Sequence, residues 1–254
     1  MATRENTLIL FDVDGTLTVP RLAATQEMHD VLKALRDKVT IGIVGGSDLV
    51  KQVEQLGASV LADFDFVFAE NGLAAYEKGQ SIGEQSFKDH LGEEALGELI
   101  DFTLSEFSKV KLPKKRGTFV EYRKGMLNLC PIGRSCSQDE RREFFEYDKI
   151  HKIREALVEK FTAKFGSFQT ADGRQINLKF SIGGEISFDA FPVGWDKTFC
   201  LQYVEKRFEN ILFFGDKTAK GGNDFEIYND PRVKGYTVVS YQDTIRILKE
   251  LYNV

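Results

Sequence analysis

Two aspartates separated by a single valine follow an apolar run near the start of the chain. The run occupies residues 8–11 and ends at Asp12, and Asp14 comes two residues later. Paired carboxylates can divide a group transfer between them, because one serves as nucleophile and the other as general acid and base. An aspartate that attacks phosphorus forms an aspartyl-phosphate, which splits one difficult transfer into two easier steps. The pattern therefore predicts that Asp12 is the nucleophile and Asp14 the acid/base.

The Asp-x-Asp spacing has a simpler interpretation, in which a loop after a strand carries aspartates that cap a helix. The longer string Asp-Val-Asp-Gly-Thr-Leu-Thr at 12–18 is more specific. It resembles motif I of the haloacid dehalogenase superfamily. The later motifs of the sequence can be compared with those of this superfamily.

A glycine-rich turn follows the next apolar run, at Gly45-Gly46-Ser47-Asp48. Glycines between a strand and a helix let backbone amides and a hydroxyl approach a phosphate, which predicts phosphate binding by Ser47. A tight turn capped by Ser47 or Asp48 is the alternative. Lys197 follows Asp196 in the first turn of a predicted helix, where it can reach a phosphate or remain an ordinary surface lysine. The two positions match motifs II and III of the superfamily.

Acidic residues near the end of a later strand predict a metal site. The apolar run at 211–214 ends in Gly215-Asp216, and the string Gly221-Gly222-Asn223-Asp224 follows shortly after. Carboxylates that converge from separate strand ends supply the hard oxygen ligands that Mg²⁺ requires. For Asp224, helix capping is the alternative. The predicted ligands are Asp12, Asp14, Asp216, Asn223 and Asp224.

The elements that must position these side chains are buried strands that alternate with amphipathic helices. Ligands of such sheets bind at the carboxyl ends of the strands. We therefore expect an α/β fold with a Rossmann-like, doubly wound parallel-sheet core, formed by residues 1–86 and 194–254. Between them, helices and hairpin-like strands predict an inserted α+β cap over 87–193. A Ser137-Gln138-Asp139-Glu140 capping box opens one long predicted helix in the cap.

The predicted cap contains a second group of candidate residues. Four arginines fall in one short stretch: Arg116, Arg123, Arg134 and Arg141. Arginine holds phosphate with a planar fork that keeps its charge, and the last two flank a helix start where an anion is favoured. The two-residue period of a strand places Ser187 and Asp189 on one face, where they can bind sugar hydroxyls together. The alternative is that the arginines pair with nearby carboxylates.

Composition excludes several classes of protein. The chain has 254 residues, 42% of them hydrophobic, which suffices for a substantial core. Its net charge of −5 argues against nucleic-acid binding. No apolar run approaches the roughly 20 residues that span a bilayer, and the N-terminus lacks a signal-like segment, so the expected location is the cytoplasm. Three cysteines and three histidines favour reduced thiols and argue against a zinc site.

Several strings distributed along the chain resemble the eukaryotic phosphomannomutase family. They are Arg-Gly-Thr-Phe at 116–119, Pro-Ile-Gly-Arg-Ser at 131–135, Ile-Ser-Phe-Asp at 186–189, Gly-Trp-Asp-Lys at 194–197 and Phe-Phe-Gly-Asp-Lys-Thr at 213–218. The resemblance implies a Mg²⁺-dependent interconversion of mannose 6-phosphate and mannose 1-phosphate for GDP-mannose synthesis. It also implies an aspartyl-phosphate, a hexose 1,6-bisphosphate as intermediate and activator, and a cytoplasmic homodimer joined through the cap.

The resemblance also assigns residues. It makes Asp12 the nucleophile and Asp14 the acid/base. It implies sugar-phosphate binding by Arg21, Arg123, Arg134, Arg141, Ser187 and Asp189. It suggests a second ion near Tyr228, Asp230 and Val233, although a valine can offer only its carbonyl oxygen. Residues 166–177 look longer than the usual link of the family, and we expect a surface loop there with no function.

Two other functions remain open. A sugar-phosphate phosphatase of the same superfamily would use the same residues in a site that admits water. A non-catalytic binder would keep the pocket without the reaction, and the intact Asp12, Asp14, Lys197 and Asp216 argue against it.

Overall fold

The computed structural model describes residues 2–254. The chain divides into two compact units, one formed by residues up to 84 together with 194–254, and the other by residues 85–193. We call them the core unit and the cap unit, and each is described by itself. Among the described residues, no helix combines the length and the apolar character needed to cross a membrane.

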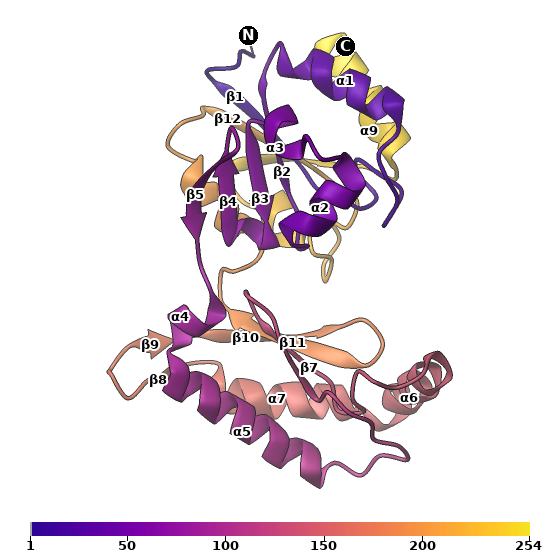
Figure 1. Ribbon diagram of the computed structural model, residues 1–254, viewed down its shortest axis with the longest axis vertical. Helices are drawn as coiled ribbons and strands as arrows, with labels where there is room; N and C mark the ends of the chain where they lie inside the picture. Colours follow the sequence, from indigo (N-terminus) through magenta and orange to yellow (C-terminus); the bar gives the residue numbers. More distant parts are fainter. Residues whose placement is uncertain (1) are drawn as a thin grey trace. The chain divides into compact units, whose positions relative to one another are not determined.

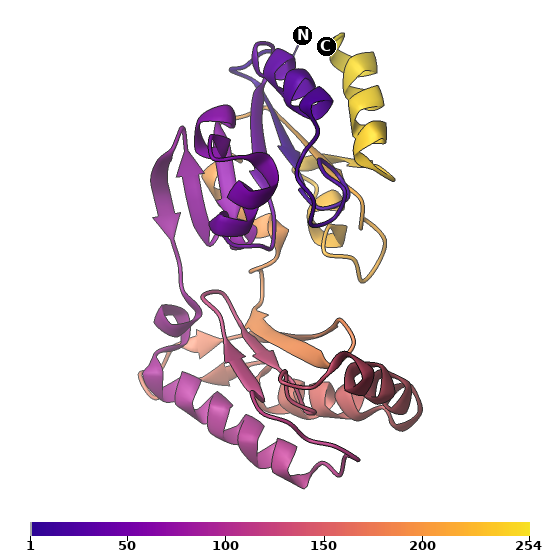
Figure 2. The same ribbon diagram turned by 45° about the vertical axis from the view of Figure 1, so that its right-hand side comes forward.

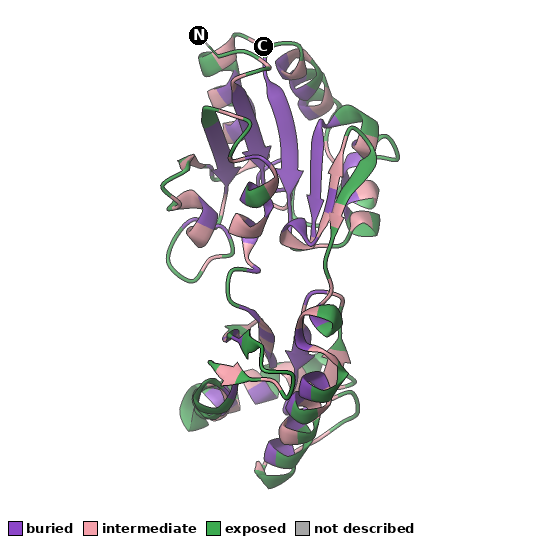
Figure 3. Cartoon of the chain, turned by 90° about the vertical axis from the view of Figure 1, so that its left-hand side faces the viewer, coloured by how far each residue is buried: buried purple, intermediate pink, exposed green. Residues whose placement is uncertain are grey.

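A seven-stranded sheet forms the centre of the core unit, with the order β13-β12-β1-β2-β3-β4-β5 (Figure 1). Its first five strands in this order are parallel, and β4 and β5 continue the sheet as an antiparallel hairpin. The strands are β1 (Thr7–Phe11), β2 (Thr40–Val44), β3 (Phe66–Ala69), β4 (Ala74–Glu77), β5 (Gln80–Glu84), β12 (Asn210–Gly215) and β13 (Val233–Thr237). Figure 3 shows the inner strands as buried, whereas the edge strand β5 is mostly exposed.

Helices cover both faces of this sheet, as the apolar run at 8–11 predicted. Ile9 and Phe11 pack with α1 (Gln26–Arg36) and α9 (Tyr241–Tyr252), which lie side by side (Figure 2). Leu8 and Leu10 point to the opposite face, toward η2 (Lys197–Tyr203) and α8 (Phe225–Tyr228). Every residue of β1 is buried, because the alternating side chains of a strand meet a covered face on either side. The doubly wound α/β core is confirmed.

The remaining helices of the core unit are short. They are α2 (Leu49–Leu56), α3 (Val60–Asp63) and the 3₁₀ turn η1 (Glu70–Gly72). Asp48 caps α2 by accepting a hydrogen bond from the Lys51 amide, and Asp196 caps η2 by accepting one from the Thr198 amide. η2 is a 3₁₀ helix, where the sequence predicted an ordinary helix.

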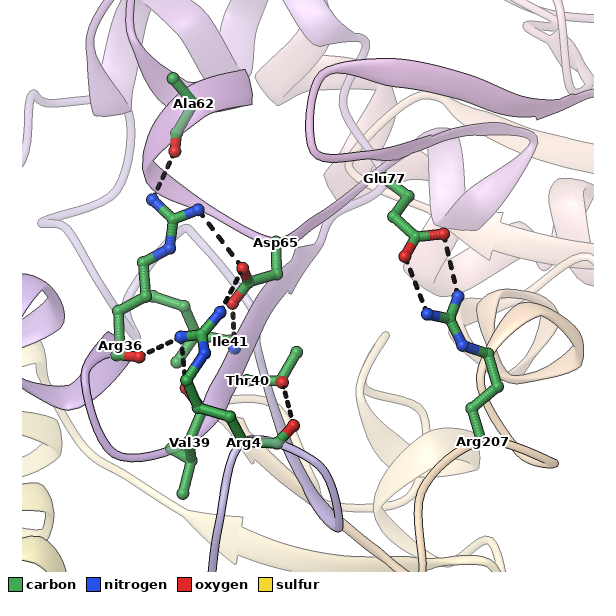
Figure 4. Close-up of polar contacts among 9 residues, drawn as sticks. All are labelled: Arg4, Arg36, Val39, Thr40, Ile41, Ala62, Asp65, Glu77 and Arg207. Atoms are coloured by element: carbon green, nitrogen blue, oxygen red, sulfur yellow. Dashed lines mark hydrogen bonds and ion pairs between the residues drawn. The ribbon is translucent and has the colours of Figure 1, made fainter.

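Ion pairs brace the end of the core sheet at which the parallel strands begin (Figure 4). The buried Asp65 carboxylate accepts hydrogen bonds from Arg4 at 2.7 Å, Arg36 at 3.3 Å and the Ile41 amide at 3.1 Å. Arg207 forms a two-pronged pair with Glu77 at 2.8 and 2.9 Å. These contacts join segments distant in sequence at the end opposite the predicted active-site edge.

The cap unit contains a four-stranded antiparallel sheet with the order β10-β11-β7-β6. Its strands are β6 (Val120–Tyr122), β7 (Leu127–Leu129), β10 (Leu178–Gly183) and β11 (Ser187–Pro192). Two helices, α5 (Glu93–Lys109) and α7 (Ile153–Phe165), pack against one face of it (Figure 1). Phe161 of α7 contacts Phe102 and Phe107 of α5 and Phe180 and Phe188 of the sheet, so aromatic rings form this interface.

The prediction of a single long helix after Ser137 is wrong, because this segment forms two helices, α6 (Gln138–His151) and α7 (Ile153–Phe165). The capping box at Ser137 is present and opens α6, and the C-cap residue Lys152 has a left-handed conformation. α7 begins directly afterwards. Asp148 explains the break: its carboxylate accepts from the Arg154 amide at 2.9 Å and from Arg154 Nε at 2.7 Å, so a buried ion pair spans the junction.

Residues 166–177 lie largely at the surface, as expected, although Ile176 is buried, and they form a small hairpin where the sequence predicted a loop. Its strands are β8 (Phe168–Gln169) and β9 (Gln175–Ile176). Arg174 donates hydrogen bonds to the carbonyl oxygens of His90 at 2.6 Å and Leu91 at 3.0 Å. These carbonyls end the short helix α4 (Phe87–Leu91), so the hairpin caps a helix of the same unit.

Candidate active site

A buried lysine joins two carboxylates at the carboxyl end of the core sheet. Lys197 donates to Asp12 Oδ1 and, at 2.5 Å, to Asp224 Oδ1. Its side chain is only 1% exposed, and Asp224 is fully buried. The remaining Asp224 oxygen accepts from the Lys217 amide at 2.9 Å. Asp224 therefore orients the lysine through its side chain and does not cap α8 with it, because no side-chain capping bond is present there.

Asp216 lies beside this group. One ligand oxygen from each of Asp12, Asp216 and Asp224 can be chosen so that the three lie within 4.8 Å of one another. Asp216 Oδ1 is buried and has no hydrogen-bond partner among the residues that the structure describes. Gly15 has a φ of +84°, and a Cβ there would lie 2.5 Å from Asp216 Oδ2, so only glycine leaves this carboxylate its place.

These carboxylates fit a divalent cation. With Lys197 charged and Asp12, Asp216 and Asp224 ionised, this largely buried group would carry a net charge of −2, which is costly away from bulk water unless it is compensated. An ion such as Mg²⁺ would supply that compensation and would satisfy the orphaned Asp216 oxygen.

The protein environment shifts the pKa values of these groups. Burial raises the pKa of Asp12 to about 6, although the Lys197 charge opposes the shift. Burial also raises the pKa of Asp216. For Lys197, burial alone would lower the pKa, but the charges of Asp12 and Asp224 outweigh it and the net pKa is raised. The lysine therefore stays charged and favours the ionised form of its carboxylate partners.

The Asp14 carboxylate is held by partners outside the group of Asp12, Asp216 and Asp224. Its Oδ1 accepts from Gln55 Nε2 at 2.8 Å and from the Arg21 amide at 2.7 Å. Arg21 is exposed, and it is its main chain that contacts Asp14. Asp14 is not among the described carboxylates whose oxygens lie within 4.8 Å of one another, so the structure does not group it with the three candidate ligands.

Ser47 and Asn223 line a small pocket with Asp12 and Asp14. The pocket has a volume of about 130 Å³ and also includes Gln55. Ser47 is half-buried and follows β2, as the sequence predicted. A space of this size beside the Asp12 carboxylate suits a single phosphoryl group. The structure thus brings Asp12, Asp14, Ser47 and Asn223 to one pocket.

The residues suggested for a second ion do not fit one as they are placed. Asp230 accepts from Arg232 at both carboxylate oxygens, at 2.8 and 2.7 Å, and its main-chain oxygen accepts from the Val233 amide. Arg232 also pairs with Glu205. Tyr228 packs tightly against Gly235. The cation beside Asp230 is thus the guanidinium of Arg232, and an ion would have to displace it.

Within the cap unit, two of the predicted arginines converge on Glu121. Arg123 Nη2 lies 2.9 Å and Arg134 Nε 2.6 Å from Glu121 Oε2. Arg134 also donates to Asn128 Oδ1 at 2.6 Å. Asn128 in turn donates to both predicted sugar-binding residues, Ser187 at 2.9 Å and Asp189 at 2.6 Å.

Arg141 lies elsewhere on the cap unit. Its Nε is 3.4 Å from Glu185, in the turn before β11, and its position is in the first turns of α6. Arg116 pairs with Glu140 of the capping box. The alternative that these arginines pair with carboxylates therefore describes their contacts in this structure. Each pair is partly exposed, so an anionic ligand can compete with the carboxylate at small cost.

Two residues that contact the predicted site residues were not identified from the sequence. Gln55 lies on the buried side of α2, where a glutamine is unusual, and it contacts Asp14. Asn128 lies between two fully buried leucines in β7. A polar residue among buried neighbours is the signal that could have identified both, since a buried amide needs partners.

Comparison with known proteins places this geometry in a family. A family model described as eukaryotic phosphomannomutase matches residues 28–254. The chain is 58% identical over 237 residues to a phosphomannomutase of Dendrobium officinale, covering 93% of this chain and 90% of that one. It is 54% identical over 254 residues to a phosphomannomutase of Oryza sativa subsp. indica, covering 99% of both chains.

Solved structures show the same fold at low identity. A trehalose-6-phosphate phosphatase of Aspergillus fumigatus matches with a TM-score of 0.58 and 16% identity, covering 98% of this chain and 94% of that one. A haloacid dehalogenase-like hydrolase of Bacteroides thetaiotaomicron matches with a TM-score of 0.57 and 11% identity, covering 97% and 100%. The expected superfamily fold is confirmed.

Proposed function

This chain belongs to the eukaryotic phosphomannomutase family, and we propose that it interconverts mannose 6-phosphate and mannose 1-phosphate through an aspartyl-phosphate. The observation that carries the mechanism is the buried Asp12 carboxylate, held by Lys197 at the end of β1 and open to a pocket of phosphoryl size. A fixed, partly desolvated carboxylate needs little reorganisation before it attacks phosphorus. Asp12 is therefore the nucleophile.

Asp14 is the acid/base in this proposal. It lines the same pocket, and Gln55 and the Arg21 amide hold one of its oxygens. A carboxyl group with one oxygen fixed in this way can present the other to the departing or entering sugar oxygen. Asp14 would protonate that oxygen as Asp12 takes the phosphoryl group, and it would remove the proton in the reverse step.

The magnesium site consists of Asp12, Asp216 and Asp224 in this proposal, with Asn223 and Asp14 as further candidates. When bound, Mg²⁺ neutralises charge on the transferring phosphate. Lys197 and Ser47 contribute a charge and a hydroxyl to the same phosphate. Because Lys197 already spans two carboxylates, it keeps Asp12 oriented between transfers.

The sugar and the phosphate that does not react are assigned to Arg21 and to the cap-unit residues Arg123, Arg134, Arg141, Ser187 and Asp189. One nucleophile must serve two phosphates, so the enzyme carries a hexose 1,6-bisphosphate that reverses its orientation between transfers. That bisphosphate also phosphorylates Asp12 at the start, which makes it the activator. Water must be excluded while Asp12 carries the phosphoryl group, because hydrolysis would turn the mutase into a phosphatase.

We further propose a cytoplasmic homodimer that supplies GDP-mannose synthesis and is joined through the cap unit. In support, the cap unit has an open groove of about 260 Å³, with Ile132, Phe144, Tyr147 and Ile150 in its lining. Ile150 is 77% exposed and shares this groove with the other apolar side chains, so an apolar patch reaches the surface here. The molecular mass of the wild type and of an Ile150→Asp variant, measured by sedimentation, would test the proposed dimer. A monomeric wild type would refute it.

A product assay separates the proposed mutase from a sugar-phosphate phosphatase. Mannose 1-phosphate is incubated with Mg²⁺, with and without a hexose 1,6-bisphosphate, and both mannose 6-phosphate and free phosphate are measured. We expect isomer as the main product and a strong dependence on the bisphosphate. Free phosphate as the main product in the presence of bisphosphate would refute the mutase. Asp12→Asn should abolish both products, so it is a control for the nucleophile and not for this distinction.

A further inference from the structure

Asn128 occupies the centre of a row of polar side chains on the cap sheet. In the strand register it lies opposite Glu121 of β6 and opposite Asp189 of β11. Directly opposed residues point to the same face of a sheet, so these three side chains share one face. Asn128 is only 4% exposed, and its neighbours Leu127 and Leu129 are fully buried.

The partners of Asn128 fix the orientation of its amide group. Its oxygen accepts from Arg134 Nη1 at 2.6 Å, and its nitrogen donates to Asp189 Oδ1 at 2.6 Å and to Ser187 Oγ at 2.9 Å. A guanidinium can only donate, and an ionised carboxylate can only accept. The reversed amide would therefore place oxygen against Asp189 and hydrogens against Arg134.

This orientation determines what Ser187 and Asp189 can offer to a ligand. Because Ser187 Oγ accepts from Asn128, its own hydrogen is left to donate. Asp189 uses Oδ1 for Asn128, so Oδ2 is left to accept. A donor and an acceptor two residues apart on one strand face match two neighbouring hydroxyl groups of a hexose.

We propose that Asn128 is a positioning residue for sugar recognition, which sets Ser187 as a donor and Asp189 Oδ2 as an acceptor while it holds Arg134. The proposal rests on the proposed function, because it takes the cap residues to bind a hexose phosphate. It adds a residue that the sequence did not assign to the site.

Electrostatics around Asp189 agrees with this geometry. Burial raises the pKa of Asp189, and the hydrogen bond from Asn128 opposes that shift, as do the charges of Arg123 and Arg134. The charge of Glu121, like burial, raises the pKa of Asp189. Removing the Asn128 donor would therefore raise the pKa of Asp189 further and leave it less able to accept from a sugar at mildly acidic pH.

The test uses Asn128→Asp and Asn128→Ala, each in an Asp12→Asn background that blocks turnover. The first keeps an acceptor for Arg134 but loses both donors, and the second removes the group without adding charge. Asn177→Asp is the matched control, because it makes the same change at an exposed asparagine of the same unit. Calorimetry measures mannose 6-phosphate binding with Mg²⁺ from pH 5 to 8, circular dichroism checks folding, and carbon NMR follows Asp189.

We expect both Asn128 variants to bind the sugar phosphate about tenfold more weakly or worse, as for loss of a hydrogen bond to a charged group. In Asn128→Asp, the pKa of Asp189 and the acidic limit of binding should move to higher pH, which a general packing defect would not cause. Unchanged affinity and an unchanged Asp189 pKa would overturn the proposal, and so would unfolding of both variants. Because binding and Asp189 titration are read without turnover, failure of the mutase assay alone would refute the proposed reaction and leave this result standing.

Discussion

Lys197→Met is the most informative perturbation of the core site. The substitution keeps the length of the side chain but removes the charge that joins Asp12 and Asp224. Both carboxylates are buried, at 6% and 0% exposure of their side chains, so neither can recover hydration without local opening. Breaking a buried ion pair by removal of one partner costs about 3–5 kcal/mol. We expect the free energy of unfolding of the metal-free protein to fall by that amount.

Mg²⁺ should offset part of this loss. An ion at about 100 times its Kd stabilises a folded protein by roughly 2.7 kcal/mol, and the variant gains more than the wild type because its carboxylates lack a counter-charge. Turnover should nevertheless fall by about 100-fold or more, since a fixed positive charge beside the transferring phosphate is lost. The stability gap between variant and wild type should therefore narrow with Mg²⁺, while the activity gap should not.

Urea unfolding in EDTA and in Mg²⁺ measures these effects, followed by fluorescence of Trp195, the single tryptophan of the chain. Trp195 is buried in the core unit next to this site, so it reports on the unit concerned. Lys217→Met is the matched control, because Lys217 is exposed and contacts Asp224 through its backbone amide, which the substitution keeps. If the free energy of unfolding of Lys197→Met without metal lies within about 1 kcal/mol of that of the control, the buried ion pair does not stabilise the protein as proposed.

Four further outcomes are expected. Asp12→Asn should abolish turnover without loss of metal-free stability, since it lowers the buried negative charge; near-normal activity in a product assay would contradict the nucleophile assignment. Arg141→His should weaken substrate binding more than folding, because the Arg141–Glu185 pair is partly exposed; equal KM values would count against it. Asp148→Ala should lower the free energy of unfolding by about 3–5 kcal/mol in urea titrations, because Arg154 would stay buried without its partner. Because burial raises the pKa of Asp12 to about 6, above its ordinary value, the stability contributed by the protonated carboxyl at low pH is lost as the pH rises through 6 in the metal-free protein. Addition of Mg²⁺ should therefore raise Tm more at pH 7.5 than at pH 5, and an equal shift in thermal unfolding at both would refute this linkage.

The sequence predicted those features that follow from local pattern. An uninterrupted apolar run indicated a strand covered on both faces, and β1 is buried throughout. Capping residues before apolar periodicity marked helix starts at Ser137 and Asp196, and both caps are present. The position of Asp12 at the carboxyl end of a parallel strand followed from the same rules. These features depend on a few consecutive residues, so the sequence contains them directly.

The break at Lys152 and the hairpin at 168–176 were not predicted, because they depend on partners elsewhere in the chain. α6 ends where Asp148 turns to Arg154, and the hairpin is fixed by the contact between Arg174 and the end of α4. Helical periodicity continues across the break and gives no warning of it. At the break, the conformation is decided by the pairing of the buried Asp148 and Arg154 side chains, which lie on different helices.

The partner of each functional side chain was likewise decided only by the tertiary structure. The sequence placed Lys197 and Asp224 in the site, but only folding showed that the lysine bridges Asp224 and Asp12. It gave no role to Asn128, which the cap sheet brings between Arg134 and Asp189. Periodicity indicates which face a residue occupies, whereas hydrogen bonds and charges depend on distances of a few ångströms across separate elements. The chain by itself therefore determined the chemistry that is present, and packing determined which groups act on one another.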